Sequence, residues 1–276
     1  MAVCSRIGHS TDRLRAAALT TGFTASLAAP SAGLLAVLLA MLLAVAAPQA
    51  LAQSSCSSDG QRAPVALVER FISADCGTCW ADPVTPRAKA GELALDWIVP
   101  SAKGDDAPLS AAASRDAVAR LQALRMDAPR SVASARHNMA TPSAAKALTL
   151  RVARGVALGG YMGTSIELKP VRGSPLPRQP LTAWLLLVEE VPAGTDGTPV
   201  LRNLVRNTLL SSWNIHSKLL NKEQAKDNHR SKPARLYESR PMSIPAGANP
   251  DHLRVVGWVE DASGRVLATA ASVCAK

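Results

Sequence analysis

Residues 65–80 read Val-Ala-Leu-Val-Glu-Arg-Phe-Ile-Ser-Ala-Asp-Cys-Gly-Thr-Cys-Trp, and this stretch decides the fold that we predict for the first half of the chain. Its opening, Val65–Ser73, is rich in apolar, β-branched and aromatic side chains and predicts a strand. It ends in Cys76 and Cys79, two thiols spaced so that they can close a small disulfide and open it again. Because the first turn of a helix tolerates proline, Trp80–Ala90 predicts a helix directly after the pair.

Two further elements follow in the first half. Leu93–Val99 is a second apolar run and predicts a buried strand. Leu109–Arg125 repeats alanine, valine and leucine at helical spacing, with arginines between them, and predicts an amphipathic helix. The order strand, cysteine pair, helix, strand, helix suits a right-handed βαβ unit.

The second half has a different pattern, in which strand-like runs alternate with glycine and proline. Ala262-Ser263-Gly264 is a hairpin signal between the last two runs. Runs of this number and spacing indicate an antiparallel sandwich. The predicted strands are Leu148–Ala153, Tyr161–Pro170, Ala183–Val191, Val200–Leu209, Arg235–Ile244, Leu253–Asp261 and Val266–Val273.

The first 52 residues have the pattern of a Sec-type signal peptide. A basic start precedes an uncharged apolar core at Leu34–Ala47, and Ala50-Leu51-Ala52 is a small-x-small cleavage site. The core is shorter than the roughly 20 residues of a spanning helix, so we prefer cleavage to the alternative of an N-terminal membrane anchor. We therefore expect a periplasmic or secreted protein, residues 53–276, without a membrane span.

Four cysteines remain after cleavage, an even number that suggests disulfides in an exported chain. Cys76 and Cys79 form one pair. A bridge between Cys56 and Cys274 would join the two ends of the mature chain and is the favoured second pair. The competing interpretation is a free Cys56 that acts as a resolving thiol.

Charge and composition exclude several functions. The chain of 276 residues has 31 Lys and Arg against 21 Asp and Glu, a formal net charge of +10. The densest basic stretch, Lys218–Arg235, has no aromatic residue on which bases could stack, so no nucleic-acid partner is predicted. The histidines are too scattered for a zinc site. No metal or other cofactor is predicted, and the oligomeric state stays open.

The first half resembles the thioredoxin superfamily, and more closely a family of exported bacterial thioredoxin-like proteins of unknown function. The matching residues are Val68, Glu69, Phe71, Cys76, Cys79, Asp96-Trp97 and the Asn203–Asn207 region. The resemblance implies an α+β protein in which a thioredoxin-like α/β domain, residues 53–145, is followed by an antiparallel β-sandwich domain, residues 146–276. It also implies a proline loop opposite the disulfide, for which Thr141-Pro142 is the nearest candidate.

Two functions from different classes are open. In the first, Cys76 is the catalytic nucleophile and Cys79 the resolving thiol of a thiol-disulfide oxidoreductase whose partners are protein thiols or disulfides of the cell envelope. In the second, the protein is a non-catalytic secreted binding or structural protein whose disulfides are structural. Glu69 stands one residue out of step with the buried acid of thioredoxins, so we expect it to be an ion-pair partner at an edge or interface.

Overall fold

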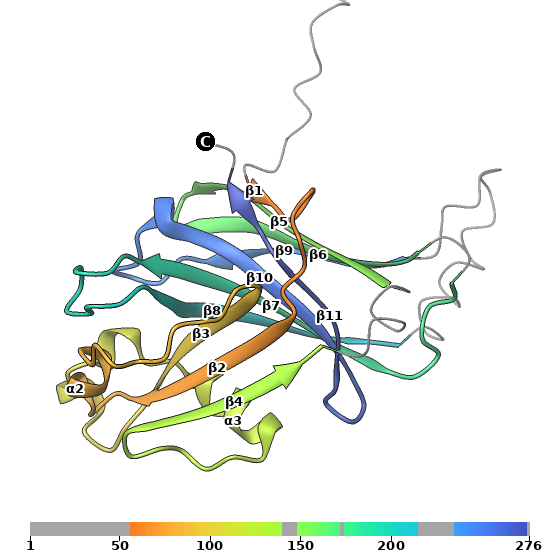
Figure 1. Ribbon diagram of the computed structural model, residues 1–276. Helices are drawn as coiled ribbons and strands as arrows, with labels where there is room; N and C mark the ends of the chain where they lie inside the picture. The colour runs from red at the N-terminus through yellow and green to blue at the C-terminus, as the bar shows by residue number, and fades with distance from the viewer. Residues whose placement is uncertain (1–55, 140–147, 172–173, 215–234, 275–276) are drawn as a thin grey trace, which may run out of the picture. The chain divides into compact units, whose positions relative to one another are not determined.

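The computed structural model describes residues 56–139, 148–171, 174–214 and 235–274, which form two β-sheets (Figure 1). The first sheet contains, in spatial order, β12 (Val273–Cys274), β1 (Cys56–Ser57), β5 (Leu148–Leu158), β6 (Tyr161–Pro170) and β9 (Leu236–Ser243). The second contains β11 (Val266–Ala271), β10 (Leu253–Asp261), β7 (Leu181–Val191), β8 (Arg202–Trp213), β3 (Glu92–Val99), β2 (Ala66–Ser73) and β4 (Val132–Asn138).

The helices in the described residues are short. The α-helices are α2 (Gly77–Trp80) and α3 (Arg115–Leu124), and single 3₁₀ turns occupy Gly104–Asp106, Ser110–Ala112 and Pro250–His252. Helix α3 begins at Ser114, whose hydroxyl accepts a hydrogen bond from the Ala117 amide at 3.2 Å, the usual contact of an N-cap serine.

The seven-stranded sheet is covered on both faces. Alternation along the strands sends Leu67, Phe71 and Trp97 to one face, where they share a core with Leu121 of α3. Near β7 and β10 the opposite face packs against the five-stranded sheet. Near β2 and β3 it packs against the turn that contains Cys76 and Cys79, which we call the cysteine turn. The two sheets approach closely at Gly257 of β10, because an added Cβ there would lie 2.8 Å from Val152 Cγ1.

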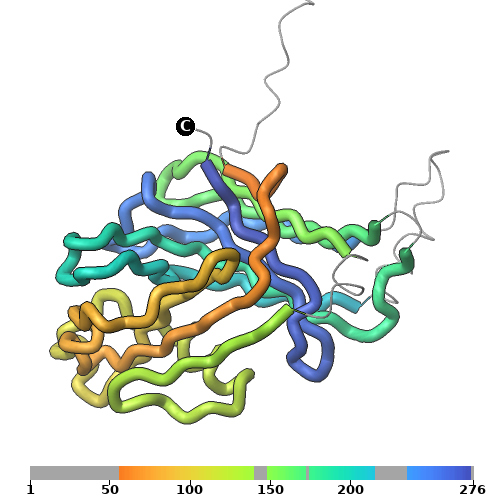
Figure 2. The backbone as a smooth tube through the Cα atoms, in the orientation of Figure 1, coloured from red at the N-terminus to blue at the C-terminus, as the bar shows by residue number. Residues whose placement is uncertain are grey.

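The described ends of the chain pair with each other. Figure 2 shows the first strand, in orange, beside the last, in blue. Cys56 and Cys274 are directly opposite one another in the antiparallel pair of β1 and β12, and a disulfide joins them. The predicted bridge between the ends is confirmed.

The predicted fold class is wrong, and so is the resemblance to exported thioredoxin-like proteins. Strands from both halves join one large sheet instead of forming an α+β pair of units: β3 runs parallel to β8, with Asp96 opposite Leu204. The helix predicted over Trp80–Ala90 is also wrong. Helix α2 ends at Trp80, Pro83 lies in a turn after it, and Pro86 lies in a segment that is neither helix nor strand. Proline removes backbone donors and disfavours helical geometry in the preceding residue.

Many individual elements are as predicted. Strands β6 and β10 have the predicted bounds, β2 and β3 differ from them by one residue at the start, and the hairpin after β10 turns at Gly264 with a positive φ of 81°. Strand β4 was missed. The proposed signal peptide, residues 1–52, and the domain boundary at 145–146 lie outside the described residues. Within the described part of the chain, no helix is long and apolar enough to cross a membrane.

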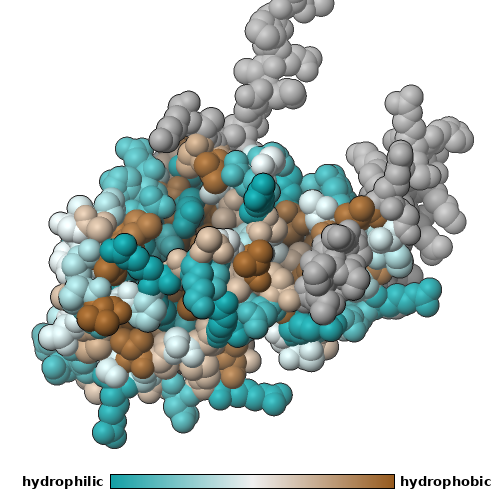
Figure 3. All heavy atoms as spheres, in the orientation of Figure 1, coloured by the Kyte–Doolittle hydropathy of each residue, from teal (hydrophilic) through white to brown (hydrophobic). Residues whose placement is uncertain are grey.

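The surface has no broad apolar patch on the face drawn in Figure 3. Apolar residues, in brown, are scattered among hydrophilic ones, in teal. Scattered apolar residues are normal for a protein surface, whereas a large contiguous patch would mark a docking face. For this face, a binding site is therefore better sought in a cavity than in a flat surface.

Candidate functional site

The cysteine pair lies in the turn that follows β2. Cys76 caps the four-residue helix α2, Cys79 lies within that helix, and a disulfide joins them. Both residues are half-buried, and Cys76 Sγ lies 3.5 Å from the hydroxyl oxygen of Thr78. Pro108 packs beside Gly77 in the turn, since a Cβ atom added at Gly77 would lie 3.4 Å from Pro108 Cβ. The structure brings the two predicted catalytic residues together in a partly covered turn.

The turn lacks the surroundings that the resemblance implied. The described residues contain no cis peptide bond, and Thr141-Pro142 lies outside them. Asp75 directly precedes Cys76 and accepts a hydrogen bond from Ser101 Oγ at 2.9 Å. A carboxylate beside a cysteine disfavours the thiolate that attacks disulfides.

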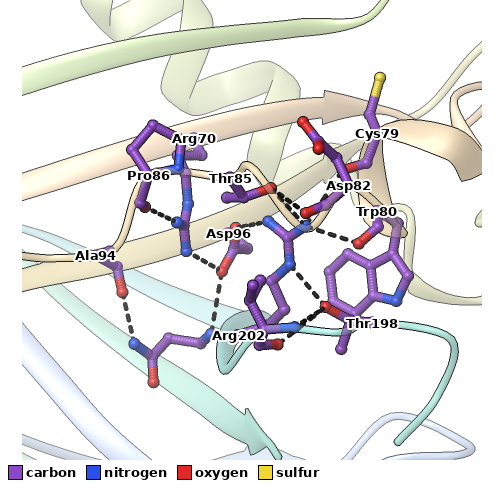
Figure 4. Close-up of polar contacts among 12 residues, drawn as sticks. Arg70, Cys79, Trp80, Asp82, Thr85, Pro86, Ala94, Asp96, Thr198 and Arg202 are labelled. Atoms are coloured by element: carbon purple, nitrogen blue, oxygen red, sulfur yellow. Dashed lines mark hydrogen bonds and ion pairs between the residues drawn. The ribbon is translucent and has the colours of Figure 1, made fainter. Parts of the chain in front are cut away.

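Arg202 of β8 donates hydrogen bonds to the backbone of the cysteine turn (Figure 4). Its Nη2 donates to the carbonyl oxygens of Trp80 at 2.7 Å and Cys79 at 3.2 Å, and to Thr85 Oγ1 at 3.0 Å. The guanidinium also lies over the Trp80 ring, 5.0 Å from its centroid. Trp80 itself is buried and donates from Nε1 to the carbonyl oxygen of Asp196 at 2.8 Å. The backbone of the cysteine turn is therefore fixed by charge-assisted hydrogen bonds.

Asp96 of β3 holds two arginines at once (Figure 4). This fully buried carboxylate accepts hydrogen bonds from Arg70 Nη2 at 2.7 Å and from Arg202 Nη1 at 3.3 Å. It also accepts one from the backbone N–H of Asn203 at 3.0 Å. Burial lowers the pKa of Arg202, and the nearby Arg70 lowers it further, so that the opposing effect of Asp96 is outweighed. Two buried cations thus share one carboxylate.

A second buried polar cluster lies on the other face of the sheet. Arg120 of α3 donates to both oxygens of Glu69, and its Nη2 lies 2.9 Å from Glu260 Oε1. Burial raises the pKa of Glu69, but His137 and Arg120 lower it by more, so the pKa lies below its ordinary value. Glu69 is an ion-pair partner as predicted, although it lies in the core and not at an edge or interface.

Sequence reasoning missed most of the residues that surround the cysteine turn. Arg70 and Asp96 are charges inside apolar strand runs, which is a visible signal for a buried ion pair because buried charges need partners. Arg202 has the same signal, because it lies inside the predicted strand Val200–Leu209, but nothing in the sequence identifies Asp96 as its partner. The contacts of Arg202 and Asn203 with Asp96 join residues 106 and 107 positions apart in the chain.

One cavity adjoins these elements, and a larger one lies elsewhere in the fold. The smaller, about 370 Å³, lies beside the Asp96 network, and its lining includes Arg70, Arg87 and Asn203. The larger, about 720 Å³, lies between residues 58–65 and strands β5, β6 and β11. We base no site on the larger cavity, because its lining residues Met139 and Leu148 flank a segment outside the described residues.

The described residues contain no group of three or more His, Cys, Asp or Glu that could hold a metal ion. All four cysteines after the proposed cleavage site are in disulfides, so none is available as a thiolate ligand in this state. The cationic side chains and amides around the smaller cavity are donors, which suits an anion better than a metal.

No protein-family model and no curated protein matches the chain. Among solved structures, it is similar to HBP35 of Porphyromonas gingivalis, with 11% identity, a TM-score of 0.43 and coverage of 77% of this chain and 76% of that one. It is also similar to a domain of the outer membrane lipoprotein Omp28 from the same organism, with 10% identity, a TM-score of 0.28 and coverage of 45% and 85%. At these scores the likeness assigns no function to this chain.

Proposed function

We propose that this is an exported, non-catalytic binding protein in which both disulfides are structural. One observation carries the proposal: Arg202, buried and paired with Asp96, donates to the carbonyl oxygens of Cys79 and Trp80. The disulfide holds these acceptors in place, and the acceptors satisfy the donors of a buried cation. Opening the disulfide would loosen the acceptors, and a buried charge that loses hydrogen bonds is costly.

The location outside the cytoplasm is supported by two features. The first 52 residues have the composition of a signal peptide, and disulfides persist mainly in exported proteins. The bridge between Cys56 and Cys274 closes nearly the whole mature chain into one loop, which suits a protein that must stay folded in an oxidising compartment. Periplasm and extracellular space are both compatible with these features.

A second candidate function is thiol-disulfide exchange with protein thiols or disulfides of the cell envelope, with Cys76 as nucleophile and Cys79 as resolving thiol. Partial exposure favours it, since both cysteines are half-buried rather than buried. Exchange requires that an incoming thiolate reach a sulfur of the pair. The carboxylate of Asp75 beside the pair opposes the approach of an anionic thiolate.

The reduction potential of the Cys76–Cys79 pair decides between the two functions. The mature chain would be equilibrated in thiol buffers of graded potential, and its free thiols trapped and counted by mass spectrometry. A C56S/C274S variant assigns the midpoint to the remaining pair. We expect a midpoint below about −300 mV, as for structural disulfides, whereas a midpoint between about −270 and −120 mV would establish an exchange-competent pair and overturn the proposal.

A further inference from the structure

We infer that the cavity beside the Asp96 network binds the carboxylate of a small organic acid, with Arg70 and Arg87 as the cationic contacts. The inference rests on the proposed binding function and names the class of ligand. The cavity has a volume of about 370 Å³, which lies at the lower end of the range for small-molecule sites.

The charge of the cavity wall is one-sided. Two arginines, Arg70 and Arg87, are among its lining residues, and no aspartate or glutamate is. Thr85 and Asn203 add neutral polar groups. A wall with guanidinium groups and no carboxylate attracts an anion, and the planar donors of arginine match the two oxygens of a carboxylate.

Arg70 has donors to spare. A guanidinium carries five N–H groups. Within the described residues, Arg70 Nη1 donates to the carbonyl oxygen of Pro86 at 2.8 Å and Nη2 donates to Asp96 Oδ2 at 2.7 Å, while its buried Nε has no hydrogen-bond partner. The side chain is only 7% exposed, so the unused donors are poorly supplied by bulk water. Nε is shielded from solvent and so from a ligand in the cavity, which leaves the second N–H of Nη1 and of Nη2 as the donors for an entering carboxylate.

The network behind the cavity has one fully buried carboxylate between two buried cations. Asp96 lies 2.7 Å from Arg70 Nη2 and 3.3 Å from Arg202 Nη1. Asp82, which also faces Arg202, accepts a hydrogen bond from the Val84 amide at 2.8 Å. An anion in the cavity would add a further negative charge beside these two cations.

The rest of the wall is apolar and selects an organic anion. Pro86, Ala94, Val200 and Leu201 line the cavity. A hydrated inorganic ion would leave this surface in contact with water, whereas the carbon body of an organic acid would cover it.

The polar groups are already held in place. Hydrogen bonds to the Pro86 carbonyl oxygen and to Asp96 fix Arg70. Asn203 donates from Nδ2 to the Ala94 carbonyl oxygen at 2.8 Å, and its Oδ1 accepts from Arg254 Nη2 at 2.6 Å. Side chains that are fixed before binding lose little conformational entropy when a ligand arrives.

Calorimetric titration of the mature, disulfide-intact protein tests the inference, with benzoate, acetate and inorganic phosphate as probes. Arg87 and Ala88 are exposed lining residues, so both can be changed without disturbing the core. We expect benzoate to bind more tightly than acetate or phosphate. Arg87→Gln should weaken benzoate binding about tenfold, while Arg115→Gln, the same charge change on an exposed residue of α3, should leave it within twofold.

A second pair of variants separates charge from shape. Ala88→Glu adds a carboxylate to the wall and should abolish measurable binding, whereas the neutral Ala88→Gln should retain it within about threefold. Absence of saturable benzoate binding, or equal binding by all variants, would overturn the inference. Equal affinity for all three probes, or tighter binding of phosphate, would overturn the assignment of an organic acid. A midpoint potential typical of exchange would overturn the proposed function and leave these binding results intact.

Discussion

Arg120 donates from Nε and Nη2 to both carboxylate oxygens of Glu69, although the two residues come from α3 and β2 and both side chains are at most 1% exposed. The same guanidinium contacts Glu260. Arg120 Cζ lies 4.6 Å from the ring centroid of Trp184. One helix is thereby joined to two strands of the large sheet through a buried cation. The packing of α3 on the sheet depends on charge pairing as well as on apolar contact.

Removal of the Arg120 charge should destabilise the protein strongly. Arg120→Met keeps much of the side-chain volume but leaves Glu69 and Glu260 buried without their common cation. We expect a loss of about 3–5 kcal/mol in the free energy of unfolding, measured by urea denaturation. Arg115→Met, on an exposed position of the same helix, is the control and should change stability by less than about 0.5 kcal/mol. Equal stability of the two variants would contradict the structural role of the cluster.

Glu69 should also give the protein a specific acid sensitivity. Its pKa is lower in the folded state than the ordinary value of 4.5, so the unfolded state binds the proton more tightly. Its contribution to stability is therefore fully present above about pH 4.5 and is lost as the pH falls through the lower folded pKa. Urea denaturation between pH 7 and pH 3 should show a smaller loss for Glu69→Gln than for the unchanged protein. Parallel pH profiles would refute this contribution.

The sequence predicted local elements better than their assembly. The runs that became β2, β3, β6 and β10 have continuous apolar or alternating patterns, and these patterns depend only on nearby residues. Strand β4, Val132–Asn138, escaped detection because it is an edge strand with small and polar side chains and no buried residue. The parallel contact of β3 with β8 has no local signal, and this contact, which joins strands of both halves in one sheet, contradicts the predicted fold class.

The candidate site was predicted only in part, for a similar physical reason. The two-residue gap between Cys76 and Cys79 is a local signal, and the disulfide is present. The donors that fix the turn come from Arg202, which is 122 residues from Trp80 in the chain. A cavity is a property of the assembled fold, so the grouping of Arg70 and Arg87 on one wall could not be predicted from spacing alone.

Gly257 should be intolerant of a side chain. A Cβ at this position of β10 would lie 2.8 Å from Val152 Cγ1 and 3.0 Å from Ile166 Cδ1, so these side chains or the sheet that carries them would have to shift. We expect Gly257→Ala to lose about 1–3 kcal/mol in the free energy of unfolding. Gly163→Ala on β6 is the matched control, because an added Cβ there meets nothing within 4 Å. If both variants unfold at the same denaturant concentration, the close approach of the sheets at Gly257 is wrong.

The two disulfides should differ in their contribution to stability. Cys56 and Cys274 are separated by 218 positions and Cys76 and Cys79 by 3, and the chain-entropy gain of a crosslink grows with the length of the closed loop. On that basis the disulfide that closes the long loop contributes about 5 kcal/mol to the free energy of unfolding, and the one that closes the short loop about 2 kcal/mol. The hydrogen bond from Arg202 to the Cys79 carbonyl oxygen adds to the second contribution.

The expected order is therefore that C56S/C274S lowers the free energy of unfolding more than C76S/C79S does. Urea denaturation of both variants under non-reducing conditions measures the difference, and their unchanged m-values would show that the folded and unfolded states remain comparable. Arg202→Met in the C76S/C79S background then isolates the contact with the turn. If the Cys76–Cys79 disulfide is structural, Arg202→Met should lower the free energy of unfolding less in the C76S/C79S background than in the unchanged protein. The carbonyl acceptors of Arg202 are already loosened when the disulfide is absent. Fully additive losses would mean that Arg202 and the disulfide stabilise the turn independently.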